Sequence, residues 1–114
     1  MNASADTNIA LSLAQFAAEL CYESIPEVAR QRAKHLILDA VGIALASTRY
    51  EFAQRTLSAA RELGEGDSDV IGFGAKLSLR DAMLLNATLV HGLDYDDTHG
   101  RGVIHATASC FPAA

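Results

Sequence analysis

The sequence predicts an all-α fold, mainly helical, with a short β-ribbon near residues 69–78. Half of the 114 residues are apolar, but only 6% are aromatic and Trp is absent, so helix-forming Ala and Leu supply most of the hydrophobic content. Apolar residues also recur at helical spacing over much of the chain. A chain of this length has room for one small domain.

The first predicted helix covers residues 7–22. It can follow Asp6 or Thr7 as N-cap, because short polar side chains satisfy the first free backbone N–H groups of a helix. Most of its apolar residues share one stripe, namely Ile9, Leu11, Leu13, Phe16, Ala17, Leu20 and Cys21. The segment lacks the basic region of a signal peptide, which predicts a cytoplasmic location.

A second helix is expected from Pro26 to about Ser47. Proline is well tolerated at the first position of a helix, and Glu27 lies near the positive end of the helix dipole. Between residues 36 and 46 this helix is apolar on every side apart from Asp39, so other parts of the protein should bury it. The apolar run is too short to cross a membrane, so we expect no membrane association.

The middle of the chain changes from helical to extended character. A third helix is predicted from about Glu51 to Leu63, before the turn-forming run GEGDSD. The next run, DVIGFGAKLS, is short, β-branched and interrupted by two glycines, which favours a small β-ribbon.

A fourth helix is predicted to begin after Ser78. Ser78 and Asp81 form a variant of the capping box in which Asp replaces the usual Glu or Gln. One face of this helix carries four apolar residues, Ala82, Leu85, Leu89 and Leu93. The helix therefore delivers His91 and Asp94 to its C-terminal end. Two glycines then predict a flexible loop, which can fold back on the helix end, so we expect Asp94 and His105 to approach one another. The run VIHATASCFPAA then resumes apolar character.

Ionisable residues gather in HGLDYDDTHGRGVIHATAS, residues 91–109, which holds three of the four histidines. Three carboxylates, those of Asp94, Asp96 and Asp97, follow the helix directly. The C-terminal end of a helix carries partial negative charge, so local electrostatics disfavour anions there. Such a conflict is more frequent at functional sites than on ordinary surfaces.

Three interpretations of this cluster remain open from the residues alone. A metal site would use Asp94, Asp96, Asp97 and His99, since carboxylate and imidazole suit Mg²⁺, Mn²⁺ or Fe²⁺, although the spacing matches no sharp metal motif. An acid/base site would use a carboxylate or histidine tuned by its charged neighbours. His91 and Asp94 lie three positions apart, so we expect them on one helical face, where they can hydrogen-bond. The alternatives without chemistry are a satisfied packing histidine at His91 and a solvated turn in which Asp96 and Asp97 cap the next segment.

Other function classes find little support. The net charge is −5 and no basic cluster is present, so nucleic acid is not an expected partner. Cys21 and Cys110 lie far apart without the spacing of a metal site, so we expect both to be small buried apolar residues.

The chain resembles the N-terminal part of the MmgE/PrpD family, which includes 2-methylcitrate dehydratases, cis-aconitate decarboxylases and iminodisuccinate epimerase. Three stretches carry the resemblance, which covers nearly the whole chain from about Ile9: IPEVARQRAKHLILDAVGIALAST, SDVIGFGAKLSLRDAMLLNATLVHGLDYDDTH and HATAS. The motif H-x-L-D-[FY]-D-D-T with a following His is the most specific of these. The chain departs from the family pattern at Ala106, where Pro is common, and at Ala87, where Gly is common.

The resemblance implies that residues 1–114 are an incomplete N-terminal portion of the family's helical domain. Members are several times longer, with a helical domain built from both ends of the chain and a smaller α/β lid. Their chemistry is elimination, decarboxylation or epimerisation next to a carboxylate of a small polycarboxylate, without a required metal or other cofactor. A homodimer is also implied.

Individual roles follow from the same resemblance. Asp94 and His105 are the implied catalytic residues for proton transfer, and Thr98 is the implied hydrogen-bond donor to a substrate oxygen. We expect His91 and Arg101 to contribute to substrate binding, and no metal to be bound. A polycarboxylate needs several cationic partners, and Arg101 is the only one near the cluster, so others must come from elsewhere.

Three interpretations of the whole chain stay open. The chain is part of a lyase, in which case it should be inactive and self-associating when isolated, or it is a stand-alone helical binding or subunit module without catalysis. A small metal-binding protein is the remaining alternative.

Overall fold

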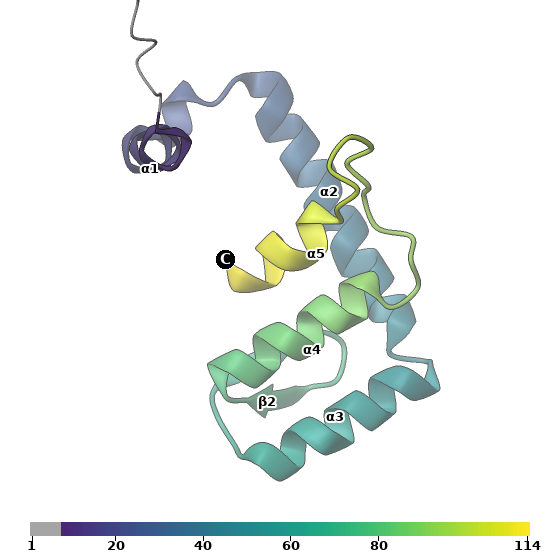
Figure 1. The fold of residues 1–114 in the computed structure, drawn as a ribbon. Coiled ribbons are helices and arrows are strands. Elements are labelled where there is room, and N and C mark those ends of the chain that lie inside the picture. The colour runs from purple at the N-terminus through teal and green to yellow at the C-terminus, as the bar shows by residue number, and fades with distance from the viewer. Residues whose placement is uncertain (1–7) are drawn as a thin grey trace, which may run out of the picture. The chain divides into compact units, whose positions relative to one another are not determined.

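The computed structural model describes residues 8–114 and contains helices and one small β-ribbon (Figure 1). The described residues divide into two compact units, residues 8–32 and residues 33–114. The elements in chain order are α1 (Ile9–Glu19), η1 (Tyr22–Ser24), α2 (Glu27–Ser47), α3 (Glu51–Leu63), β1 (Ser68–Val70), β2 (Ala75–Leu77), α4 (Leu79–His91), α5 (Ala106–Cys110) and η2 (Phe111–Ala113). The prediction of a mainly helical fold with a short ribbon is confirmed.

The first unit is built around α1. Asn8 is its N-cap, since the Asn8 side chain accepts a hydrogen bond of 3.1 Å from the backbone N–H of Leu11. The predicted caps, Asp6 and Thr7, lie outside the described residues. The helix ends at Glu19, three residues earlier than predicted, because Leu20 adopts an extended conformation. No residue of α1 is buried, so its apolar stripe is exposed.

Helix α2 begins one residue after Pro26 and ends at Ser47, close to the predicted limits. Only one face of its second half is buried, that of Ala40, Ile43, Ala44 and Ser47. Ile37, Leu38 and Leu45 remain exposed, so the expectation that the whole apolar segment is covered is wrong for the described residues. The neighbouring elements of the second unit lie against a single side of the helix. None of the described helices has both the length and the apolar character needed to cross a bilayer.

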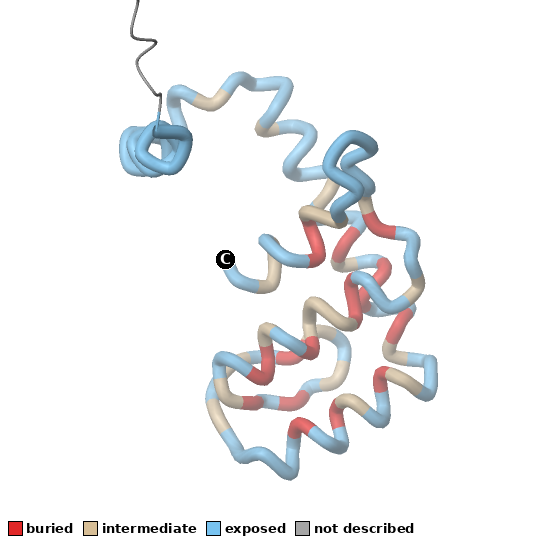
Figure 2. Tube along the Cα trace, in the orientation of Figure 1, coloured by how far each residue is buried: buried red, intermediate tan, exposed pale blue. Residues whose placement is uncertain are grey.

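Helix α4 lies at the centre of the second unit and contacts α3, both strands, α5 and η2. Its buried residues, together with those of α2, α3 and the ribbon, form one hydrophobic core (Figure 2). Leu77, Leu85, Leu89 and Val90 are its largest fully buried apolar side chains. The predicted apolar face of α4 thus packs as expected, except that the helix ends before Leu93.

The ribbon pairs β1 and β2 in antiparallel register, with Asp69 opposite Lys76. The connection contains Gly72 at φ +74° and Gly74 at φ +57°, the left-handed region that glycine adopts without a steric penalty. Asn86 of α4 holds the ribbon, since its side-chain oxygen accepts from Ile71 N–H at 2.9 Å and its amide donates to the Asp69 carbonyl at 3.1 Å. Two hydrogen bonds from one side chain therefore fix the ribbon on α4.

The predicted cap of α4 is present. Ser78 Oγ accepts from the backbone N–H of Asp81 at 3.3 Å and donates to Asp81 Oδ2 at 2.7 Å. The guanidinium of Arg80 also donates to the Asp81 carboxylate, at 2.8 Å. These hydrogen bonds, first from Arg80 and then from Ser78, hold the pKa of Asp81 below its ordinary value.

We expect the substitution Asp81→Asn to destabilise the protein at neutral pH. Because the pKa of Asp81 is lower in the folded state, its stabilisation is present above the unfolded pKa of about 4 and is lost as the pH falls through the folded value. Urea unfolding of wild type and variant across pH measures this difference. The exposed Asp67 provides the control variant Asp67→Asn. A difference between wild type and Asp81→Asn that persists unchanged well below pH 4, roughly the unfolded value, would contradict the prediction.

Candidate active site

The site begins where α4 ends. Helix α4 stops at His91, and the backbone N–H of Asp94 then donates to the His91 carbonyl at 2.8 Å. Asp94 itself has φ +55°, which reverses the chain direction. Gly92 permits this end because a Cβ there would collide with the ring of Phe52 and lie 2.7 Å from the Thr88 carbonyl oxygen. The hydroxyl of Ser47 in α2 donates to the Leu89 carbonyl at 2.6 Å and anchors this last turn.

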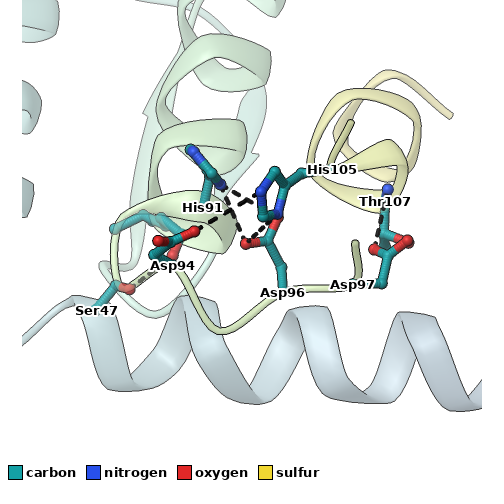
Figure 3. Close-up of polar contacts among 8 residues, drawn as sticks. Ser47, His91, Asp94, Asp96, Asp97, His105 and Thr107 are labelled. Carbon is teal, nitrogen blue, oxygen red and sulfur yellow. Dashed lines mark hydrogen bonds and ion pairs between the residues drawn. The ribbon is translucent and has the colours of Figure 1, made fainter. Parts of the chain in front are cut away.

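This early end corrects one sequence-based expectation. His91 and Asp94 do not form a pair on one helical face, since Asp94 lies beyond the helix. The partner of His91 is Asp96, whose Oδ1 lies 3.1 Å from His91 Nδ1 (Figure 3). Helical spacing predicts contacts only while the helix continues, and the left-handed Asp94 ends that regularity.

Asp96 lies between two imidazole rings and its side chain is 1% exposed. Its Oδ1 is 3.1 Å from His91 Nδ1 and 3.2 Å from His105 Nδ1. The two rings are in contact, with centroids 4.6 Å apart and planes inclined at 58°. Asp96 is therefore not part of a solvated turn, and that alternative is wrong for this residue.

The loop between Asp97 and His105 brings His105 back to the end of α4. His99 and Ile104 form an isolated antiparallel bridge, with His99 N–H donating to the Ile104 carbonyl at 2.9 Å. At its tip Val103 adopts φ +49°, a conformation that β-branched residues rarely tolerate. As predicted, His105 and Asp94 come together despite lying eleven positions apart, with Nε2 of His105 3.7 Å from Asp94 Oδ1.

The remaining candidate metal ligands serve the loop itself. The Nδ1 atom of His99 accepts from Gly102 N–H at 2.9 Å. The Asp97 carboxylate accepts from Thr107 N–H at 3.2 Å, in the first turn of α5, so Asp97 caps the next segment as the capping interpretation expected. The predicted set of Asp94, Asp96, Asp97 and His99 is therefore wrong as a ligand set. The ligand atoms that lie within 4.8 Å of one another belong to His91, Asp94, Asp96 and His105.

Two predicted substrate-binding residues lie apart from these contacts. Thr98 and Arg101 are both exposed, and neither side chain makes a hydrogen bond to another side chain within residues 8–114. Both belong to the loop that joins Asp94 to His105. The structure thus brings together His91, Asp94 and His105, adds Asp96, and leaves Thr98 and Arg101 at the surface.

A hollow of about 660 Å³ adjoins the histidines. His91 and His105 line it, together with apolar residues of α4, the loop and α5 that include Val103 and Ile104. Cys110 also lines it and is exposed, as is Cys21, so the expectation that both cysteines are buried is wrong.

Asp96 is the member of this cluster that sequence reasoning did not assign to the active site. Within the motif DYDD its neighbour Tyr95 is 79% exposed while Asp96 is 6% exposed. A carboxylate buried between histidines is costly unless it is hydrogen-bonded or paired. The sequence places three carboxylates in the run DYDD, and nothing in that run distinguishes the buried one.

Comparison with known proteins places this site in a family. Residues 11–114 match the family model described as MmgE/PrpD N-terminal domain. Cis-aconitate decarboxylase-like protein oryM of Aspergillus oryzae (strain ATCC 42149 / RIB 40) is 28% identical over 107 residues, which cover 93% of this chain and 22% of that protein. Cis-aconitate decarboxylase of Aspergillus terreus (strain NIH 2624 / FGSC A1156) is 29% identical over 115 aligned residues, covering 96% of this chain and 24% of that protein.

The chain therefore spans less than a quarter of the length of these curated relatives. No solved structure matches it significantly. The family match covers almost the whole chain and includes every residue of the histidine and aspartate cluster. The chain belongs to the MmgE/PrpD family and corresponds to its N-terminal domain.

Proposed function

We propose that this chain forms one wall of the active site of a lyase that acts on small polycarboxylates by dehydration or decarboxylation. The observation that carries the proposal is the approach of His105 Nε2 to Asp94 Oδ1, at 3.7 Å, beside the hollow that His91 and His105 line. An imidazole next to a carboxylate can hold or release one proton near neutral pH. The names of the two relatives support a decarboxylase or a related lyase.

The two reactions require the same groups. In a dehydration, a base removes a proton from the carbon next to a carboxylate, a double bond forms, and the C–O bond breaks as an acid protonates the leaving hydroxyl. In a decarboxylation, the bond to the departing carbon dioxide breaks and the carbanion that remains takes a proton from an acid. Asp94 and His105 supply the base and the acid. Thr98 donates a hydrogen bond to a substrate oxygen, and His91 and Arg101 bind substrate.

Substrate binding also needs residues outside this chain. Arg101 is the only Lys or Arg after Arg80, so the described cluster presents two aspartates and two histidines with little positive charge. A polycarboxylate requires several cationic donors, because buried carboxylates are stable only when paired. We infer that the rest of an intact protein of the relatives' length supplies them, and that this protein is a homodimer without a cofactor.

The proposal is tested on the intact protein that contains these residues. We expect carbon dioxide release from cis-aconitate, or formation of a double bond from 2-methylcitrate. The unsaturated monocarboxylate crotonate is the control, since it lacks the second carboxylate. An intact, folded protein that converts neither polycarboxylate would overturn the proposal.

Metal binding is the second candidate function, because four ligand atoms from His91, Asp94, Asp96 and His105 lie within 4.8 Å of one another. A histidine nitrogen must be unprotonated to bind a metal, however. The Nδ1 atoms of both histidines lie 3.1 Å and 3.2 Å from the same Asp96 oxygen, where a proton on nitrogen is favoured.

We therefore expect the activity to survive metal removal. The intact protein is dialysed against a strong chelator, its metal content is measured, and turnover is compared before and after. Retention of most of the activity in metal-free protein is the expected result. A loss that divalent ions alone restore would favour the metal interpretation.

A further inference from the structure

The buried carboxylate of Asp96 has an unusual environment for a charged group. Its partners within residues 8–114 are the Nδ1 atoms of two histidines, His91 and His105. Among the described residues the other buried aspartate is Asp81, which has the guanidinium of Arg80 and the hydroxyl of Ser78 as partners. A carboxylate that is 1% exposed requires hydrogen-bond donors, so protons on the histidine nitrogens must satisfy it.

His105 has a buried ring nitrogen that needs a hydrogen-bond acceptor. Its side chain is 28% exposed, but its Nδ1 atom is buried and has no aligned hydrogen-bond partner. The acceptor nearest to it is Asp96 Oδ1 at 3.2 Å, a distance suited to a hydrogen bond after a small rotation of the ring. A bare lone pair on Nδ1 would face the oxygen of a buried carboxylate without screening by solvent, so Nδ1 carries the proton. At Nε2 the carboxylate of Asp94 is farther away, at 3.7 Å, and is exposed, so solvent screens the repulsion there.

We propose that Asp96 is a positioning residue that accepts hydrogen bonds from Nδ1 of both histidines and thereby leaves Nε2 of His105 unprotonated and directed at Asp94. This inference rests on the proposed function and adds the group that sets the tautomer and orientation of the proton-transferring ring. The distances of 3.2 Å at Nδ1 and 3.7 Å at Nε2 place an aspartate at each nitrogen of His105.

The two aspartates have different surroundings and therefore different tasks. The side chain of Asp94 is 81% exposed and is accessible to a substrate, whereas that of Asp96 is buried beneath both rings. The groups that face His105 among the described residues are Asp94 and Asp96 from the loop and His91 from α4.

The first test uses the unaltered intact protein. Histidine is labelled with ¹⁵N, and the His105 signals are assigned by their loss in His105→Gln. Nitrogen chemical shifts distinguish protonated from unprotonated ring nitrogens, so they report the tautomer directly. We expect the neutral His105 ring to carry its proton on Nδ1. A neutral ring protonated on Nε2 would overturn the proposal, whatever the activity of the protein.

The second test compares Asp96→Asn, Asp96→Glu and the control Asp97→Asn. We expect Asp96→Asn to lower kcat roughly 10²-fold with little change in KM, because the amide can present its NH₂ group to Nδ1 and favour the wrong tautomer. The ¹⁵N signals of His105 in this variant should show the neutral ring protonated on Nε2, because the amide NH₂ group then faces Nδ1. Asp96→Glu should restore part of the activity and the original tautomer.

Asp97→Asn should leave both kcat and the tautomer of His105 unchanged, since Asp97 caps α5 and its replacement keeps an acceptor oxygen. If Asp96→Asn does not fold, turnover and the His105 tautomer are measured in Asp96→Glu and in the unaltered protein, and they decide the question. An Asp96→Asn protein with unchanged turnover and an unchanged His105 tautomer, alongside an inactive His105→Gln, would refute the positioning role alone. A fully active His105→Gln would instead refute the proposed function.

Discussion

Asp94→Asn and His105→Gln should each lower kcat of the intact protein by about 10²- to 10⁴-fold, the range that a positioned acid or base contributes. The two groups face each other at 3.7 Å, so each replacement removes one member of the proton-transferring pair. Turnover of cis-aconitate or 2-methylcitrate by purified variants measures the loss. Wild-type turnover in Asp94→Asn would require another residue to carry the proton.

Asp94→Asn should keep nearly the stability of the wild type. The Asp94 side chain is 81% exposed, and Asn tolerates the left-handed backbone that Asp94 adopts at φ +55° as well as Asp does. Asp67→Asn, an exposed replacement outside the cluster, is the matched control for loss of one negative charge. Thermal unfolding then separates a chemical defect from a folding defect.

A double variant tests whether the two residues act as one unit. Groups that share one proton-transfer step give non-additive losses, so Asp94→Asn combined with His105→Gln should cost about as much as the worse single change. Losses that multiply would show that the two residues act in separate steps. Both kcat and kcat/KM are needed, because a binding defect appears mainly in KM.

The isolated 114-residue chain should show no measurable turnover and should self-associate. Its described cluster offers two aspartates, two histidines and one nearby Arg, so a polycarboxylate would bind weakly. Exposed apolar side chains are numerous, including Phe16 at 63% and Leu38 at 72% exposure. Extensive exposed apolar surface promotes association in water. Analytical ultracentrifugation over a range of concentrations, together with both substrate assays, measures the two properties.

A pair of matched variants locates the associating surface. Leu38 lies on the apolar second half of α2 beside the exposed Ile37, whereas Leu63 ends α3 and is followed along the chain by the polar run GEGDSD. Leu38→Glu should therefore reduce association more than Leu63→Glu, although the two leucines have similar exposure. A monomeric isolated chain with measurable turnover would favour a minimal enzyme instead.

The sequence by itself predicted the four longer helices, the ribbon and the family, but not the short helix α5. Local signals were sufficient for α3, for the ribbon and for the Ser78 cap of α4, because turn residues and caps act within a few positions. The motif around Asp94 and the following His was enough to identify the family resemblance, which the match over residues 11–114 confirms. The approach of Asp94 to His105 was also predicted, since a glycine-bearing loop joins them.

Only the tertiary structure decided which partners those residues have. Because α4 ends at His91, this histidine contacts Asp96 and not Asp94. His99 pairs with Ile104 and therefore lies outside the cluster. The three aspartates of the run DYDD have different environments: Asp94 is exposed, Asp96 is buried and Asp97 caps α5. These outcomes depend on where the chain reverses and on which side chains the returning loop covers. Such contacts join residues from different segments, so their geometry is absent from the spacing of residues along the chain.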